Sequence, residues 1–167
     1  GPADQGPGSY FTYANLNYGV LATVMEAAAG ERFDRYMRRV LLAPLEIDGG
    51  YTLDALDGSA LAEVATLYTR QDAAGVWDPH GPWYAQYDNV SGAPPPAPIA
   101  GPRMIPTPAS VQPPADGSLR RYRLGSNATI FAPHAGLRIS ARDLAKIVLL
   151  FLDEGRYNGQ QIVAAGA

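Results

Sequence analysis

The chain has 167 residues, of which 47% are apolar and 17% charged, and its net charge is −3. This length suffices for one domain with a hydrophobic core, and the acidic balance argues against a nucleic-acid-binding protein, which is usually basic. The absence of cysteine excludes disulfides, thiolate metal sites and a cysteine nucleophile. The longest strongly apolar run, Ile147 to Leu152, is far shorter than the roughly 20 residues of a membrane span.

Two amphipathic helices are predicted near the start of the chain. The first covers about residues 15–29 and ends at Gly30. Its apolar face should be buried, since apolar side chains recur there at helical spacing. That face carries Leu16, Val20, Leu21, Val24 and Ala28. The second helix covers about residues 31–42 and ends before Pro44.

The middle of the chain is predicted to be loops and short strands. Residues 48–60 form a loop, 61–64 a helical turn and 64–71 a strand, and a turn at 72–75 returns Val76 and Trp77 as a partner strand. Nine of the 22 residues from 93 to 114 are proline, which predicts an extended surface loop within one domain rather than helix or central strand. Pro95 to Pro98 form a P-x-x-P motif, so docking of a protein partner there is an alternative role.

The last third of the chain is predicted to contain one long helix. Residues 119–132 are expected to be extended. Ser140 then caps a helix, with Asp143 at the third helical position. This helix is apolar nearly all round, which predicts a place at the centre of a core. The elements together predict a mainly α-helical fold with short strands. The end at Ala167, soon after an apolar segment begins at Ile162, suggests a truncated domain.

Nucleophilic serine catalysis needs an adjacent base, and the sequence does not supply one. None of the seven serines lies in G-x-S-x-G. In S-x-x-K, a lysine one helical turn from the serine takes its proton, but Asp143 lies three residues before Lys146, the only lysine. The two histidines, His80 and His134, lie apart without metal-ligand spacing, so neither a metal nor another cofactor is expected.

Tyr13 and Asn15 are the remaining candidate site residues. They place a phenol and a carboxamide where the first predicted helix begins. The simpler interpretation, favoured by the chemistry alone, makes Tyr13 a core aromatic and Asn15 the helix N-cap. A tyrosine is also a poor base at neutral pH unless positive charge lowers its pKa from about 10.

Two sequence blocks resemble the penicillin-recognising serine hydrolases, which include class C β-lactamases, D-Ala-D-Ala carboxypeptidases and β-lactamase-like esterases. The first block reads Pro7-Gly8-x-x-Phe11-x-Tyr13-Ala14-Asn15, followed by Tyr18-Gly19-x-Leu21, Glu26, Gly30 and Ala43-Pro44-Leu45. The second reads Ala135-Gly136-Leu137-x-x-Ser140-Ala141-x-Asp143-Leu144-Ala145. The blocks occur in the family's order and span most of residues 7–155.

This resemblance implies the helical portion of an α/β fold and an acyl-enzyme mechanism on a lactam, an ester or a peptidoglycan-type peptide. It implies that Tyr13 is catalytic, moving protons to and from the serine and the leaving group, and that Asn15 binds substrate. The S-x-x-K motif and the K-T-G or H-x-G strand are missing, and His134-Ala135-Gly136 lies at the wrong place to be the latter.

The missing motifs predict that residues 1–167 form a single partial domain of such an enzyme and are inactive alone. A further partner would then be the remainder of the enzyme. The alternative is a non-catalytic binding or scaffold module that keeps the helical fold. The resemblance favours a periplasmic or secreted location, although the lack of cysteine fits the cytoplasm equally.

Overall fold

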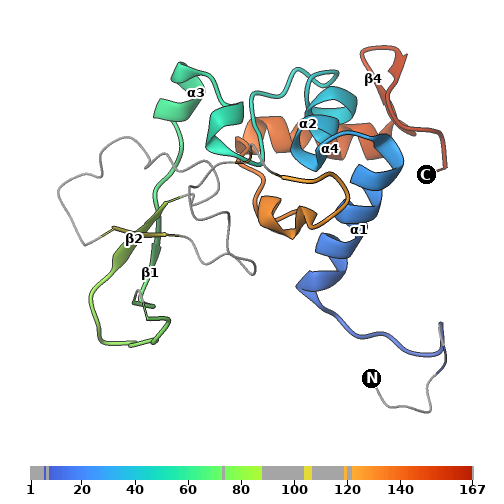
Figure 1. The fold of residues 1–167 in the computed structure, drawn as a ribbon. Helices are drawn as coiled ribbons and strands as arrows, with labels where there is room; N and C mark the ends of the chain where they lie inside the picture. Colours follow the sequence, from blue (N-terminus) through green and yellow to red (C-terminus); the bar gives the residue numbers. More distant parts are fainter. Residues whose placement is uncertain are drawn as a thin grey trace.

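The computed structural model describes residues 6, 8–72, 74–87, 104–106, 119 and 122–166. Helical elements make up most of the regular secondary structure in this part, and its strands are short (Figure 1). The helical elements are α1 (Asn15–Ala29), α2 (Phe33–Met37), the π-helical η1 (Arg38–Leu42), α3 (Gly58–Ala62), α4 (Ala141–Leu152) and the 3-10 helices η2 (Leu53–Ala55) and η4 (Ala128–Phe131). The prediction of a mainly helical chain with short strands is confirmed.

Helix α1 has the predicted bounds but buries the opposite face. Gly30 ends it in the left-handed conformation, with φ 65°. The predicted core stripe is wrong: its four large side chains, Leu16, Val20, Leu21 and Val24, are 56–63% exposed. The buried residues are Gly19, Ala22 and Glu26, because α1 packs on η4 through its small and polar side (Figure 1).

Segment 119–132, predicted to be extended, instead turns into the 3-10 helix η4, so that prediction is wrong. The Asn127 side chain accepts a hydrogen bond from the Thr129 N–H at 3.2 Å and starts the turn, and Ala132 ends it at φ 45°. All four η4 residues are buried. Packing on α1 and α2 therefore overrides the strand propensity of Thr129, Ile130 and Phe131.

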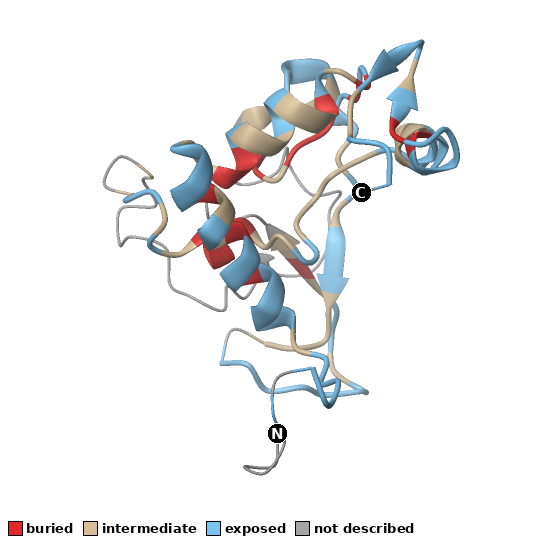
Figure 2. Ribbon diagram, turned by 90° about the vertical axis from the view of Figure 1, so that its right-hand side faces the viewer, coloured by how far each residue is buried: buried red, intermediate tan, exposed pale blue. Residues whose placement is uncertain are grey.

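Two hydrophobic clusters hold the helical elements together, and the buried residues gather where these elements meet (Figure 2). The first joins α1, α2 and η4 through Ala22, Phe33, Ala128, Ile130 and Phe131. The second joins η1, the turn after it and α4 through Leu42, Leu45, Ile47 and Leu150.

Helix α4 begins at its predicted cap but does not lie at the centre of a core. The Ser140 hydroxyl accepts a hydrogen bond from the Asp143 N–H at 3.0 Å. Within the helix only Leu150 is buried, so the central position predicted for α4 is wrong. Five of its apolar side chains, Leu144, Val148, Leu149, Phe151 and Leu152, are 48–76% exposed.

The strands of the described residues form two small sheets. Strand β1 (Leu67–Thr69) pairs antiparallel with β2 (Tyr84–Tyr87), and β3 (Met104–Pro106) pairs parallel with β2 at the sheet edge. A Gln71–Trp77 bridge and a hydrogen bond from the Gly75 N–H to the Asp72 carbonyl confirm the predicted turn, but Val76 and Trp77 form only this isolated bridge and no strand. Strand β3 belongs to the proline-rich segment and lies at the edge of its sheet, in agreement with the prediction that this segment forms no central strand. The rest of the proline-rich segment, including the P-x-x-P motif, lies outside the described residues. Near the end of the chain, β4 (Arg156–Tyr157) pairs with β5 (Gln160–Gln161).

None of the helices in the described part of the chain has the length and apolarity needed to cross a bilayer.

Replacing Gly19 by alanine is expected to lower the free energy of unfolding by roughly 1–3 kcal/mol. A Cβ at Gly19 would lie 2.2 Å from the Thr129 hydroxyl oxygen, so α1 and η4 would have to separate. Urea denaturation gives the measurement, with Gly58→Ala as the control, since nothing lies within 4 Å of a Cβ there. Equal stability of the two variants would contradict the close contact between α1 and η4.

Replacing Asp143 by asparagine is expected to lower stability by roughly 0.5–1 kcal/mol at pH 7 and by little at pH 2.5. A hydrogen bond from Lys146 and another from the Ser140 hydroxyl hold the pKa of Asp143 below its ordinary value of 3.8. A depressed pKa stabilises the fold above that value, and the effect disappears as pH falls through the folded-state pKa. Denaturation at both pH values, with exposed Asp48→Asn as control, tests this, and a pH-independent loss would be inconsistent with the ion pair.

Candidate functional site

Tyr13 and Asn15 contact each other at the beginning of α1. The Tyr13 hydroxyl donates a hydrogen bond to Asn15 Oδ1 at 2.7 Å. Tyr13 is 66% exposed and Asn15 is also exposed. The segment that leads to them extends away from the other helices (Figure 1). The pair therefore faces solvent, where a substrate or another polypeptide could reach it.

The simpler interpretation of these two residues is wrong. Tyr13 does not lie in a core, and Asn15 is the first residue of α1 rather than its cap. The N-cap position belongs to Ala14, which makes no side-chain cap hydrogen bond. Helix α1 thus begins without a capping side chain, while the nearby carboxamide binds the phenol. This arrangement forgoes the roughly 1 kcal/mol that an N-cap provides.

A turn and an extended stretch place the pair in front of α1. The N–H and hydroxyl of Ser9 both donate to the Gly6 carbonyl, at 3.2 and 2.6 Å. Gly8 adopts φ 81°, a conformation that glycine tolerates best. Tyr10 and Phe11 follow as exposed aromatic side chains. The stretch that leads to the pair therefore starts at a turn, and Pro7 lies outside the described residues.

Lys146, the only lysine of the chain, is far from the Tyr13–Asn15 pair in the sequence and binds other groups. Lys146 Nζ donates to the Glu46 carbonyl at 2.6 Å and lies 2.8 Å from Asp143 Oδ1. It therefore joins α4 to the turn after η1, where Glu46 has φ 52°. This placement agrees with the sequence, in which Lys146 has no serine three residues before it.

The histidines lie apart from the Tyr13–Asn15 pair in sequence, and both are exposed. Among the described residues, no group of three histidine, aspartate or glutamate side chains lies close enough to hold a metal ion.

An apolar surface continues from Asn15 along the exposed side of α1. We call it the α1 apolar face, and it consists of Leu16, Val20, Leu21 and Val24. Its residues follow the helical repeat, so they form one stripe that begins beside the Tyr13–Asn15 pair. Single exposed apolar residues are ordinary, whereas neighbouring exposed apolar residues form a surface on which another polypeptide could pack.

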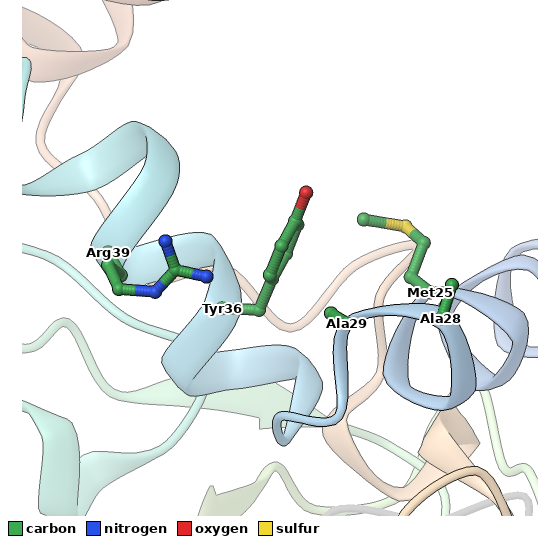
Figure 3. Close-up of a pocket in the computed structure, with 5 residues that line it drawn as sticks. All are labelled: Met25, Ala28, Ala29, Tyr36 and Arg39. Atoms are coloured by element: carbon green, nitrogen blue, oxygen red, sulfur yellow. The ribbon is translucent and has the colours of Figure 1, made fainter.

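A shallow pocket of about 300 Å³ lies at the other end of α1, lined by Met25, Ala28, Ala29, Tyr36 and Arg39. Figure 3 shows the Tyr36 ring between the Arg39 guanidinium and the α1 side chains. Arg39 pairs with Glu31 at 2.9 Å. Because a helix rises about 1.5 Å per residue, Met25 lies roughly 15 Å along α1 from Asn15. The pocket therefore does not include the Tyr13–Asn15 pair.

One polar cluster, in which the half-buried Tyr122 contacts the buried Glu26, was not predicted from the sequence. The Tyr122 hydroxyl donates to Glu26 Oε2 at 2.5 Å. A signal for this cluster was available, because Glu26 is the only charged residue of α1. A lone carboxylate in an apolar helix indicates a buried, hydrogen-bonded group.

Comparison with known proteins gives one match. A family model described as Beta-lactamase matches residues 1–167. The comparisons with curated proteins and with solved structures found no match. The family match covers the whole chain and agrees with the two sequence blocks that suggested it. The chain therefore belongs to the β-lactamase family, within the superfamily of penicillin-recognising serine hydrolases.

Proposed function

We propose that this chain supplies the Tyr-x-Asn part of a serine hydrolase that forms an acyl-enzyme on a lactam, an ester or a peptide. Tyr13 would move protons between the nucleophile and the leaving group, and Asn15 would hydrogen-bond the substrate. The observation that carries this proposal is the exposed hydrogen bond of 2.7 Å between the two side chains. Family membership supplies the reaction class.

The geometry of the pair suits both roles. Because Asn15 Oδ1 accepts from the Tyr13 hydroxyl, the Asn15 amide hydrogens can donate to a substrate carbonyl. The Tyr13 hydroxyl is both a donor and an acceptor, as a proton carrier must be. A phenol acts as a base at neutral pH only where nearby positive charge favours its ionised form, so a cation must approach Tyr13 during the reaction.

The nucleophile and this cation would come from polypeptide outside the 167 residues. The sequence contains neither S-x-x-K nor the K-T-G or H-x-G strand, and Lys146 is engaged by Asp143 and Glu46. We propose that residues 1–167 act as a partial domain and that the α1 apolar face contacts the part of the enzyme that carries the serine. This face begins beside Asn15, so a segment packed on it would end near the pair.

The purified chain is expected to hydrolyse neither nitrocefin nor p-nitrophenyl butyrate, because the pair has no nucleophile to activate. Absorbance assays with the unchanged chain and with its Tyr13→Phe variant make the comparison. Turnover by the unchanged chain that the substitution abolishes would refute the partial-domain proposal, since it would place a complete site within these residues.

In a longer enzyme that contains this chain after an S-x-x-K segment, Tyr13→Phe is expected to lower kcat by roughly 100-fold or more while the fold stays intact. The exposed Tyr10→Phe is the matched control, because it removes another phenol from the same loop. Equal kcat values for the two variants would remove Tyr13 from the mechanism. A gene whose upstream codons lack S-x-x-K would instead favour the non-catalytic scaffold.

A further inference from the structure

A buried carboxylate joins α1 to two other parts of the chain. The Glu26 side chain is fully buried and accepts three hydrogen bonds. The Phe33 N–H donates to Oε1 at 2.8 Å, while the Tyr122 hydroxyl and the Gly125 N–H donate to Oε2 at 2.5 and 3.0 Å. The donors belong to the start of α2 and to the loop before η4, so one side chain fixes three segments.

The surroundings of Glu26 fit an ionised carboxylate. All three partners are donors, and a carboxylate in its charged form is acceptor-only. Burial, together with the hydrogen bond to Glu26, raises the pKa of Tyr122, so its hydroxyl keeps the proton that it donates. The Tyr122 ring also packs edge-on against Phe131, with ring centroids 5.4 Å apart. Charge-assisted hydrogen bonds of this kind are short and directional.

The same side of α1 also contacts η4 directly. Gly19 lies against Thr129, and Thr23 Oγ1 accepts from the Ala128 N–H at 2.9 Å. The spacing of Gly19, Thr23 and Glu26 places these contacts in one line along α1. In contrast, Asn15 and Leu16 are exposed. The direction of the helix start therefore depends on contacts made further along the helix.

We propose that Glu26 and Tyr122 are positioning residues, which hold α1 at the angle that presents the Tyr13–Asn15 pair. This inference rests on the proposed function of that pair. Asn15 lies roughly 16 Å from Glu26 along the helix, so a tilt of about 10° at Glu26 would move Asn15 by roughly 3 Å. A misplacement of about 1 Å can reduce catalysis about 100-fold.

Side-chain NMR of the 167-residue chain tests this proposal without activity. In Tyr122→Phe, the carboxylate loses one donor while the ring can still pack on Phe131. We expect the Asn15 side-chain amide signals and the ring signals of Tyr13 to shift, and Glu26→Gln to shift them further. Leu150→Ala, in the cluster at α4, is the control for general destabilisation and should leave them unchanged. Unmoved signals in folded Tyr122→Phe would overturn the proposal.

The longer enzyme separates this inference from the proposed function. If Tyr13→Phe lowers kcat and Tyr122→Phe lowers it at least tenfold with little change in KM, the results support both the proposed function of the Tyr13–Asn15 pair and the positioning role of Tyr122. If Tyr13→Phe lowers kcat but Tyr122→Phe acts no differently from Leu150→Ala, the positioning role fails and the proposed function stands. If Tyr13→Phe has no effect on kcat, the proposed function itself fails.

Discussion

The buried Glu26 carboxylate is the constraint on which the assembly of the helical elements depends. A carboxylate removed from water without partners would be strongly destabilising, so α1 can pack only where donors surround it. These donors come from the start of α2 and from residues 122–125, about one hundred positions along the chain. Satisfying Glu26 therefore brings η4 onto α1, and the apolar cluster around Phe33 and Phe131 closes beside it.

As a result of this packing, one face of α1 is buried against other parts of the chain and the opposite face is exposed. One face carries small and polar residues and is used within the chain, through Gly19, Ala22 and Glu26. The α1 apolar face stays exposed and ends at the Tyr13–Asn15 pair. A helix of the β-lactamase family that exposes both an apolar stripe and a motif pair is suited to contact further polypeptide there. If the chain is a partial domain, as proposed, the remainder of the enzyme would cover both the α1 apolar face and the Tyr13–Asn15 pair.

The bounds of α1 and the start of α4 were predictable from the sequence, but the burial of the faces of these helices was not. Periodicity and Gly30 gave the bounds of α1, and Ser140 with Asp143 gave the start of α4. A prediction from hydrophobic periodicity assumes that an apolar stripe is covered by other residues of the same chain. In α1 and α4, few of the described residues cover the apolar side chains, and most of these side chains are exposed. The turn of η4 depends on tertiary packing, which strand propensity cannot report. The exposure of Tyr13 and its hydrogen bond to Asn15 likewise required the structure, since the chemistry of the residues alone favoured a core aromatic and a helix cap.

We propose that this chain carries the Tyr13–Asn15 pair but no serine that a penicillin can acylate. Intact-protein mass spectrometry after incubation with benzylpenicillin tests this proposal, because an acyl-enzyme adds the mass of the antibiotic to the protein. We expect an unchanged mass for the 167-residue chain and a single adduct for a longer enzyme that also contains S-x-x-K. A stoichiometric adduct on one of the seven serines of this chain would contradict it.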